Sequence, residues 1–99
     1  MSTLAFDIRI SAITAVEITE DSLRVDLEDG RTISIPIAWY PRLDHATEGE
    51  RKNFRMIGKG MGIHWPELDE DISVEHMLAG IPSGESQASL KRWLVARSI

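Results

Sequence analysis

The chain contains no cysteine and no long hydrophobic run. Without cysteine there is no disulfide, no thiolate zinc site, no iron–sulfur cluster and no cysteine nucleophile. No apolar stretch approaches the roughly 18 residues that span a bilayer, so we expect no membrane segment. Met1 to Arg9 lack a basic start followed by an apolar core, which argues against a signal peptide. We therefore expect one small soluble domain in the cytoplasm.

Basic residues are scarce in the first half of the chain. Residues 1–50 hold ten acidic and four basic side chains, whereas residues 51–99 hold six and seven, within a net charge of −5. This balance disfavours direct nucleic-acid binding, which depends on clustered Lys and Arg. An acidic surface can instead steer a basic protein partner. Two local basic groups, residues 51–59 and 91–97, are typical of solvated helix faces, with a partner-binding patch as the alternative.

Alternating apolar residues predict β-strands between residues 16 and 37. A two-residue turn at Asp29-Gly30 would place apolar residues opposite polar ones. A three-residue loop over residues 28–30 instead pairs Val25 with Ile33 and keeps one face apolar, with Gly30 at positive φ. Pro36 cannot donate to a ladder, so it belongs at an edge or near the end of a strand.

Short helices are expected in the middle of the chain. Pro41 can open a helix through residue 46. Thr47 and Glu50 have the capping-box spacing, which predicts a helix continuing through Arg55, with Gly58 as its stop. Residues 63–65 resemble a short strand ended by a proline, and residues 68–72 a tight turn.

The last third reads as helical. Ser73 or Asp71 can cap a helix over residues 74–79, and we expect Asp69 or Asp71 to accept its first backbone N–H groups. Ser86 can cap a helix over residues 87–97, in which Leu90, Trp93 and Leu94 form an apolar stripe at helical spacing. The expected fold is α+β: a small antiparallel sheet with β-hairpins, then short helices and a C-terminal amphipathic helix. Residues 1–82 form the domain, and residues 83–99 form a helical extension packed on it.

No set of residues indicates a specific chemistry. The glycines at 58, 60 and 62 do not lead into a helix as a phosphate loop requires. His64, Asp69, Asp71 and His76 could supply ligands or acid–base groups, but without a fixed metal-ligand spacing. Acidic residues near a helix start are already explained by the helix dipole. No cofactor, metal or catalytic residue is therefore assigned.

Two segments carry a family resemblance: residues 35–51, with the run Ile-Pro-Ile-Ala-Trp-Tyr-Pro-Arg-Leu, and residues 62–80, with Gly-Ile-His-Trp-Pro-Glu-Leu-Asp-Glu-Asp-Ile-Ser. With the Asp29-Gly30 hairpin, they resemble the bacterial domain-of-unknown-function family 2442. The resemblance implies the α+β fold of the N-terminal domain of a Nitrosomonas structural-genomics protein. In that protein a helix-turn-helix domain follows. We expect none here, because the residues after Gly80 are too few to form it. Family members are often encoded beside another small protein, in an arrangement similar to toxin–antitoxin pairs.

These observations favour a non-catalytic protein-interaction or regulatory module, the antitoxin-like half of a small bacterial protein pair. Aromatic residues and Arg are frequent interface anchors, so the candidate partner-binding residues are Trp39, Tyr40, Arg42, His64 and Trp65. Packing of the same aromatic side chains in the core is the alternative. A homodimer that covers a sheet edge is a competing use of the surface. The alternative function is a small ligand-binding or hydrolytic domain that uses the region of His64, Asp69 and Asp71.

Overall fold

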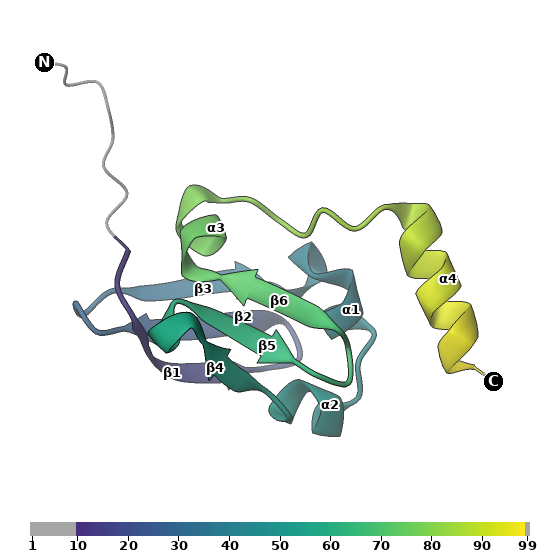
Figure 1. Ribbon diagram of the computed structural model, residues 1–99, viewed down its shortest axis with the longest axis horizontal. Coiled ribbons are helices and arrows are strands. Elements are labelled where there is room, and N and C mark those ends of the chain that lie inside the picture. The colour runs from purple at the N-terminus through teal and green to yellow at the C-terminus, as the bar shows by residue number, and fades with distance from the viewer. Residues whose placement is uncertain (1–9, 99) are drawn as a thin grey trace, which may run out of the picture.

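The computed structural model describes residues 10–98, and these form two small antiparallel sheets with short helices around them (Figure 1). The first sheet has the strand order β1-β2-β3, from β1 (Ile13–Ile18), β2 (Ser22–Leu27) and β3 (Thr32–Pro36). The second has the order β4-β5-β6, from β4 (Arg55–Ile57), β5 (Gly62–Trp65) and β6 (Glu70–Ser73). The α+β class is confirmed.

The β2–β3 hairpin has the predicted register. Val25 pairs with Ile33, and the Leu27 N–H donates to the Arg31 carbonyl at 2.8 Å, which closes a three-residue loop. Gly30 occupies the last loop position at φ +96°, a conformation that glycine adopts without strain. Pro36 is the final residue of β3, at the edge of the sheet, where its missing N–H removes no ladder bond.

The second sheet differs from the sequence-based expectation. Thr47 does begin a helix through a capping box with Glu50, but α2 (Glu48–Lys52) ends three residues before Arg55. Residues 55–57 form β4 instead, because their backbone pairs with β5. Gly58 consequently does not stop a helix, and it belongs to the 3-10 turn η2 (Gly58–Gly60). The expected tight turn over residues 68–72 is also wrong in its second half, which is strand β6.

A 3-10 turn and two short helices connect the two sheets, and a third short helix follows the second sheet. The 3-10 turn η1 (Ile37–Trp39) leads into α1 (Pro41–Asp44), which has proline at its start as expected. Helix α3 (Val74–Ala79) is capped by Ser73, whose hydroxyl accepts the His76 N–H at 3.1 Å, and it ends at Gly80 with φ +73°. The expectation that Asp69 or Asp71 caps this helix is wrong. Ser73 is closer along the chain and already occupies the cap position.

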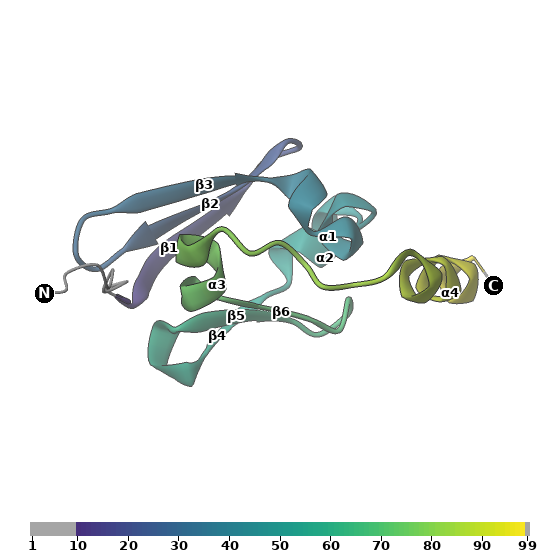
Figure 2. The same cartoon turned by 90° about the horizontal axis from the view of Figure 1, so that it is seen from above.

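The core lies between the facing sheets, as the edge-on view in Figure 2 shows. Leu23 and Val25 of β2, together with Ile63 and Trp65 of β5, have no exposed surface. The Trp65 indole N–H donates to the Arg51 carbonyl at 3.0 Å, so its polar atom is satisfied within the core. Helices α1 and α2 lie at one end of the sheets, and α4 (Gln87–Arg97) lies beyond that end.

Within residues 10–98, no helix is both long and apolar enough to cross a membrane.

Candidate functional site

The five candidate partner-binding residues do not share one exposed surface. Tyr40 and Trp65 are buried, so neither offers its ring to a partner. Trp39 remains 37% exposed, while Arg42 and His64 are only partly exposed. The two aromatic segments therefore contribute mainly to packing, and Trp39 keeps the most accessible ring of the set.

His64 pairs with Asp71 across strands β5 and β6. The His64 Nδ1 lies 2.5 Å from an Asp71 carboxylate oxygen, and the aspartate side chain is mostly exposed. Asp69 lies in the preceding turn, at φ +50°. No group of three His, Asp or Glu side chains within residues 10–98 could hold a metal ion. The region thus presents one hydrogen-bonded pair at the surface. Asp71 also lines a small cavity of about 100 Å³, but His64 and Asp69 do not, so the three residues do not converge on one enclosed site of the kind that a hydrolytic reaction requires.

Arg42 forms hydrogen bonds that hold the segment before α4 against the domain. Its Nε and Nη2 donate to the Glu85 carboxylate, at distances down to 2.7 Å, and its Nη1 donates to the Leu68 carbonyl at 2.9 Å. These hydrogen bonds lower the pKa of Glu85, because they favour its ionised form. The guanidinium also lies 5.1 Å from the centre of the Trp93 ring. Arg42 thereby connects α1, the β5–β6 turn and the start of α4.

A second ion pair holds the other end of α4. Arg97 binds both carboxylate oxygens of Glu50, at 2.7 and 2.8 Å, and its guanidinium lies 4.4 Å from the Trp93 ring centre. Hydrogen bonds lower the pKa of Glu50 to about 2, with the largest contribution from the Arg97 side chain and the next from the Thr47 backbone N–H. The face of α4 that carries Trp93 and Arg97 is therefore directed toward the domain.

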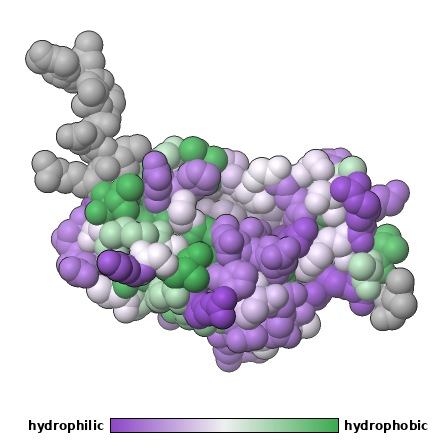
Figure 3. All heavy atoms as spheres, in the orientation of Figure 1, coloured by the Kyte–Doolittle hydropathy of each residue, from purple (hydrophilic) through white to green (hydrophobic). Residues whose placement is uncertain are grey.

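Another side of α4 carries apolar residues that are only partly covered. Leu90, Leu94 and Ala88 line a shallow groove of about 440 Å³ together with Lys91 and Gln87. Leu90 and Leu94 are half-buried, and α4 contains no buried residue. Val95, which does not line the groove, is 56% exposed. The groove side of the helix is called its free face below. Figure 3 shows apolar atoms at this end of the molecule. The predicted apolar stripe is thus divided, since Trp93 packs toward the domain while Leu90 and Leu94 face the groove.

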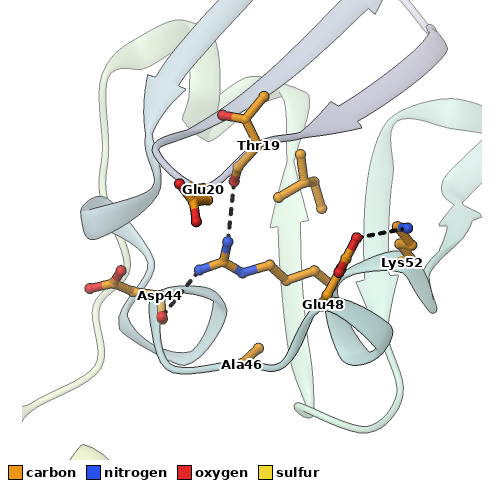
Figure 4. A pocket seen from close by; sticks show the side chains of 8 residues that line it. Thr19, Glu20, Asp44, Ala46, Glu48 and Lys52 are labelled. Carbon is orange, nitrogen blue, oxygen red and sulfur yellow. Dashed lines mark hydrogen bonds and ion pairs between the residues drawn. The ribbon is translucent and has the colours of Figure 1, made fainter.

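A larger hollow of about 650 Å³ lies between the end of β1 and helices α1 and α2 (Figure 4). Its central guanidinium, from Arg51, donates to three backbone carbonyls, those of Leu43, Thr19 and Asp44. Lys52 pairs with Glu48 at the rim. Arg51 therefore links its own helix to two other segments, the end of α1 and the β1–β2 turn. Because its donors are already used and acidic side chains also line the hollow, the hollow is poorly suited to binding an anion.

The ion pairs that position α4 were not identified in the sequence. Glu85 lies 43 residues from Arg42, and Arg97 lies 47 residues from Glu50. No local pattern indicates such distant partners. Helical spacing did single out Leu90 and Leu94, although it could not say which way they face.

Comparison with known proteins places the fold within one family. Residues 13–83 match the family described as "Protein of unknown function (DUF2442)". A crystal structure of a protein of unknown function from Rhodospirillum rubrum ATCC 11170 is similar, with 27% sequence identity and a TM-score of 0.64, over 81% of this chain and 96% of that one. None of the curated proteins matches this sequence. With most of its length matched, the chain belongs to the DUF2442 family of proteins of unknown function.

Proposed function

We propose that this protein is a non-catalytic interaction module, and that it binds a protein partner through the free face of α4. The observation that carries the proposal is the shallow groove along Leu90 and Leu94, which are only half-buried, on a helix that is clamped to the domain through Arg97. A helix of eleven residues is marginal in water by itself, and most helices are stabilised by burying an apolar face. A partner would complete that burial here.

Charge indicates the kind of partner. Lys91 lines the groove, so one basic side chain lies beside Leu90 and Leu94. The complementary surface is an apolar ridge with a carboxylate at its rim, because opposite charges at the rim increase the association rate and select the partner. We place this pairing in the bacterial cytoplasm, with the partner as the second member of a small protein pair. Direct nucleic-acid binding is not part of the proposal, since the chain is acidic overall.

The test compares two variants of the full-length chain that carry the same charge. Leu94→Asp introduces a carboxylate into the groove, and Ala96→Asp introduces one at an exposed position of the same helix outside the groove residues. We expect tagged wild-type protein and Ala96→Asp to retain the same protein from host lysate, and Leu94→Asp to lose it. With the purified partner, we expect Leu94→Asp to bind at least about tenfold more weakly, because a buried unpaired charge is costly.

Circular dichroism and size measurement accompany the test. Equal binding by both variants, or equal loss with intact folding, would show that the groove is not the contact surface. A wild-type chain that dimerises alone, and that Leu94→Asp converts to a monomer, would identify a second copy as the occupant and overturn the proposal of a different partner.

A further inference from the structure

A small polar cavity of about 100 Å³ lies between β6 and the segment that follows α3. Tyr40 and Glu70 line it together with Ser73 and His76, and residues 81–84 form the opposite wall. The cavity is separate from the free face of α4 and from the hollow beside Arg51. Its lining is mainly polar side chains and backbone, which distinguishes it from a packing defect in the core.

The wall formed by residues 81–84 is fixed at both ends. The Ile81 N–H donates to the His76 carbonyl at 2.9 Å, and the Ser83 N–H donates to the Trp39 carbonyl at 3.1 Å. Just beyond, Glu85 is held by Arg42. Because β6 is paired along its length with β5, both sides of the cavity are ordered before any ligand enters. A preformed site avoids much of the entropy cost of binding.

The phenol of Tyr40 is an unsatisfied group at this cavity. The residue is only 3% exposed, and its hydroxyl oxygen is buried without a hydrogen-bond partner among residues 10–98. Burial, with a smaller contribution from the negative charge of Glu70, raises the pKa of Tyr40 to about 12, so the hydroxyl stays protonated at neutral pH. Leaving a buried polar group unpaired costs free energy, and native proteins rarely do so without a reason.

Glu70 supplies the negative charge. It stands opposite Trp65 in the β5–β6 register and is partly buried, and its Oε1 accepts the N–H of Asp71 at 3.2 Å. Burial raises the pKa of Glu70, and the nearby charge of Arg42 opposes that rise. Arg42 itself is hydrogen-bonded to Glu85, whose charge it neutralises. The Tyr40 oxygen, buried in the wall of the cavity, therefore has no hydrogen-bond partner among residues 10–98, and the Glu70 carboxylate can accept further hydrogen bonds besides that from the Asp71 N–H.

We propose that this cavity binds a compact cationic hydrogen-bond donor, an amine or guanidinium group, which donates to Glu70 and to the Tyr40 oxygen. A volume of about 100 Å³ is room for about three waters, which is the size of such a group. A bare metal ion fits less well, because no three His, Asp or Glu side chains converge within the described residues. The group can come from a free small molecule or from a Lys or Arg side chain of another protein.

The experiment titrates the full chain, labelled with ¹⁵N, with methylguanidinium chloride and follows the amide signals of Ser83 and Gly84. Sodium chloride controls for ionic strength and urea for a neutral molecule of similar shape. We expect saturable shifts with methylguanidinium alone, weakened at least about tenfold in Tyr40→Phe and in Glu70→Gln. Glu28→Gln, an exposed carboxylate in the distant hairpin loop, should bind as the wild type does.

A second titration with the capped tripeptide N-acetyl-Gly-Arg-Gly-amide distinguishes the two sources. Binding of the tripeptide supports a protein side chain as the donor, and binding of methylguanidinium without the tripeptide supports a free small molecule. Tyr40→Phe keeps the ring and removes only the unpaired hydroxyl, so it should fold even if Glu70→Gln does not. Shifts that do not saturate, that urea reproduces, or that persist unchanged in folded Tyr40→Phe and Glu70→Gln would show that the cavity holds only water, and would overturn the proposal.

Discussion

At the scale of single residues, Gly30 allows a test of how much a positive φ contributes to the choice of glycine. A Cβ at this position would meet no atom within 4 Å, so a substitution there is opposed only by the positive φ of +96°. We expect Gly30→Val to lower the free energy of unfolding by about 1 kcal/mol or more, because a β-branched residue is strained at positive φ. Urea unfolding measures the change.

Gly84 provides the matched control for that substitution. A Cβ at Gly84 would also meet no atom within 4 Å, but the φ of this residue lies outside the positive range. Gly84→Val should therefore be close to neutral, since a side chain that fits without strain mainly reduces the entropy of the unfolded chain. If both variants were equally destabilised, the cost at Gly30 would not arise from its backbone conformation.

Single residues also show what local sequence can and cannot reveal. Thr47 and Ser86 are helix caps that local spacing identified, and the cap of α3 is Ser73, one of the two residues considered. Each of these signals lies within three or four residues of the group it binds. The unpaired hydroxyl of Tyr40 has no such signal, because it depends on which distant segments surround the ring.

At the scale of elements, strand β4 is the element that local sequence patterns did not predict. The capping box correctly starts α2, and nothing nearby in the sequence forbids its continuation to residue 55. The helix nevertheless ends at Lys52, since Arg55, Met56 and Ile57 gain backbone partners on β5. Pairing between strands is a tertiary interaction that outweighs helix propensity, which differs by less than about 1 kcal/mol per residue for ordinary residues.

The attachment of α4 to the domain should respond to acid through Glu50. Its pKa is about 2 in the folded chain, against an ordinary value of 4.5. The stability it contributes is fully present above pH 4.5 and is lost as the pH falls toward 2. In Arg97→Gln the folded pKa moves back toward 4.5, so we expect a smaller loss of unfolding free energy between pH 5 and pH 2, measured by urea unfolding across that range.

Lys52→Gln is the control for Arg97→Gln. It removes one positive charge as well, but the Lys52–Glu48 pair is largely exposed, and such pairs contribute little. Its acid dependence should follow that of the wild type. An unchanged acid dependence in Arg97→Gln would mean that the ion pair with Glu50 does not form in solution.

At the scale of the whole molecule, the fold and the candidate surface differ in how far the sequence predicts them. The β2–β3 register follows from the requirement that one face be apolar, which neighbouring residues satisfy together. The position of α4 follows from Arg42–Glu85 and Glu50–Arg97, which join residues more than 40 positions apart. Charged residues are frequent on any surface, so such pairs are not distinguishable before the chain is folded.

Removal of α4 tests whether the two-sheet domain is stable without it. A chain of residues 1–86 keeps Glu85 for Arg42 and loses Trp93, Arg97, the hydrogen bond from Ser89 to Glu85 and the free face of α4. The truncation removes the half-buried Glu50–Arg97 ion pair, of a kind that contributes about 1 kcal/mol, and two cation–π contacts of Trp93, which contribute about 0.5–1 kcal/mol each. We therefore expect the free energy of unfolding to fall by about 1–3 kcal/mol, while domains of this kind typically have about 5–15 kcal/mol.

Urea unfolding, followed by the fluorescence of the buried Trp65, should stay cooperative in the chain of residues 1–86. The dependence of the unfolding free energy on urea concentration should decrease only slightly, because it scales with the surface exposed on unfolding and α4 contains no buried residue. A broad transition, or a loss of structure throughout the chain, would contradict this expectation. In that case α4 would be part of the folding unit, and its apolar face could not be interpreted as a surface kept for a partner.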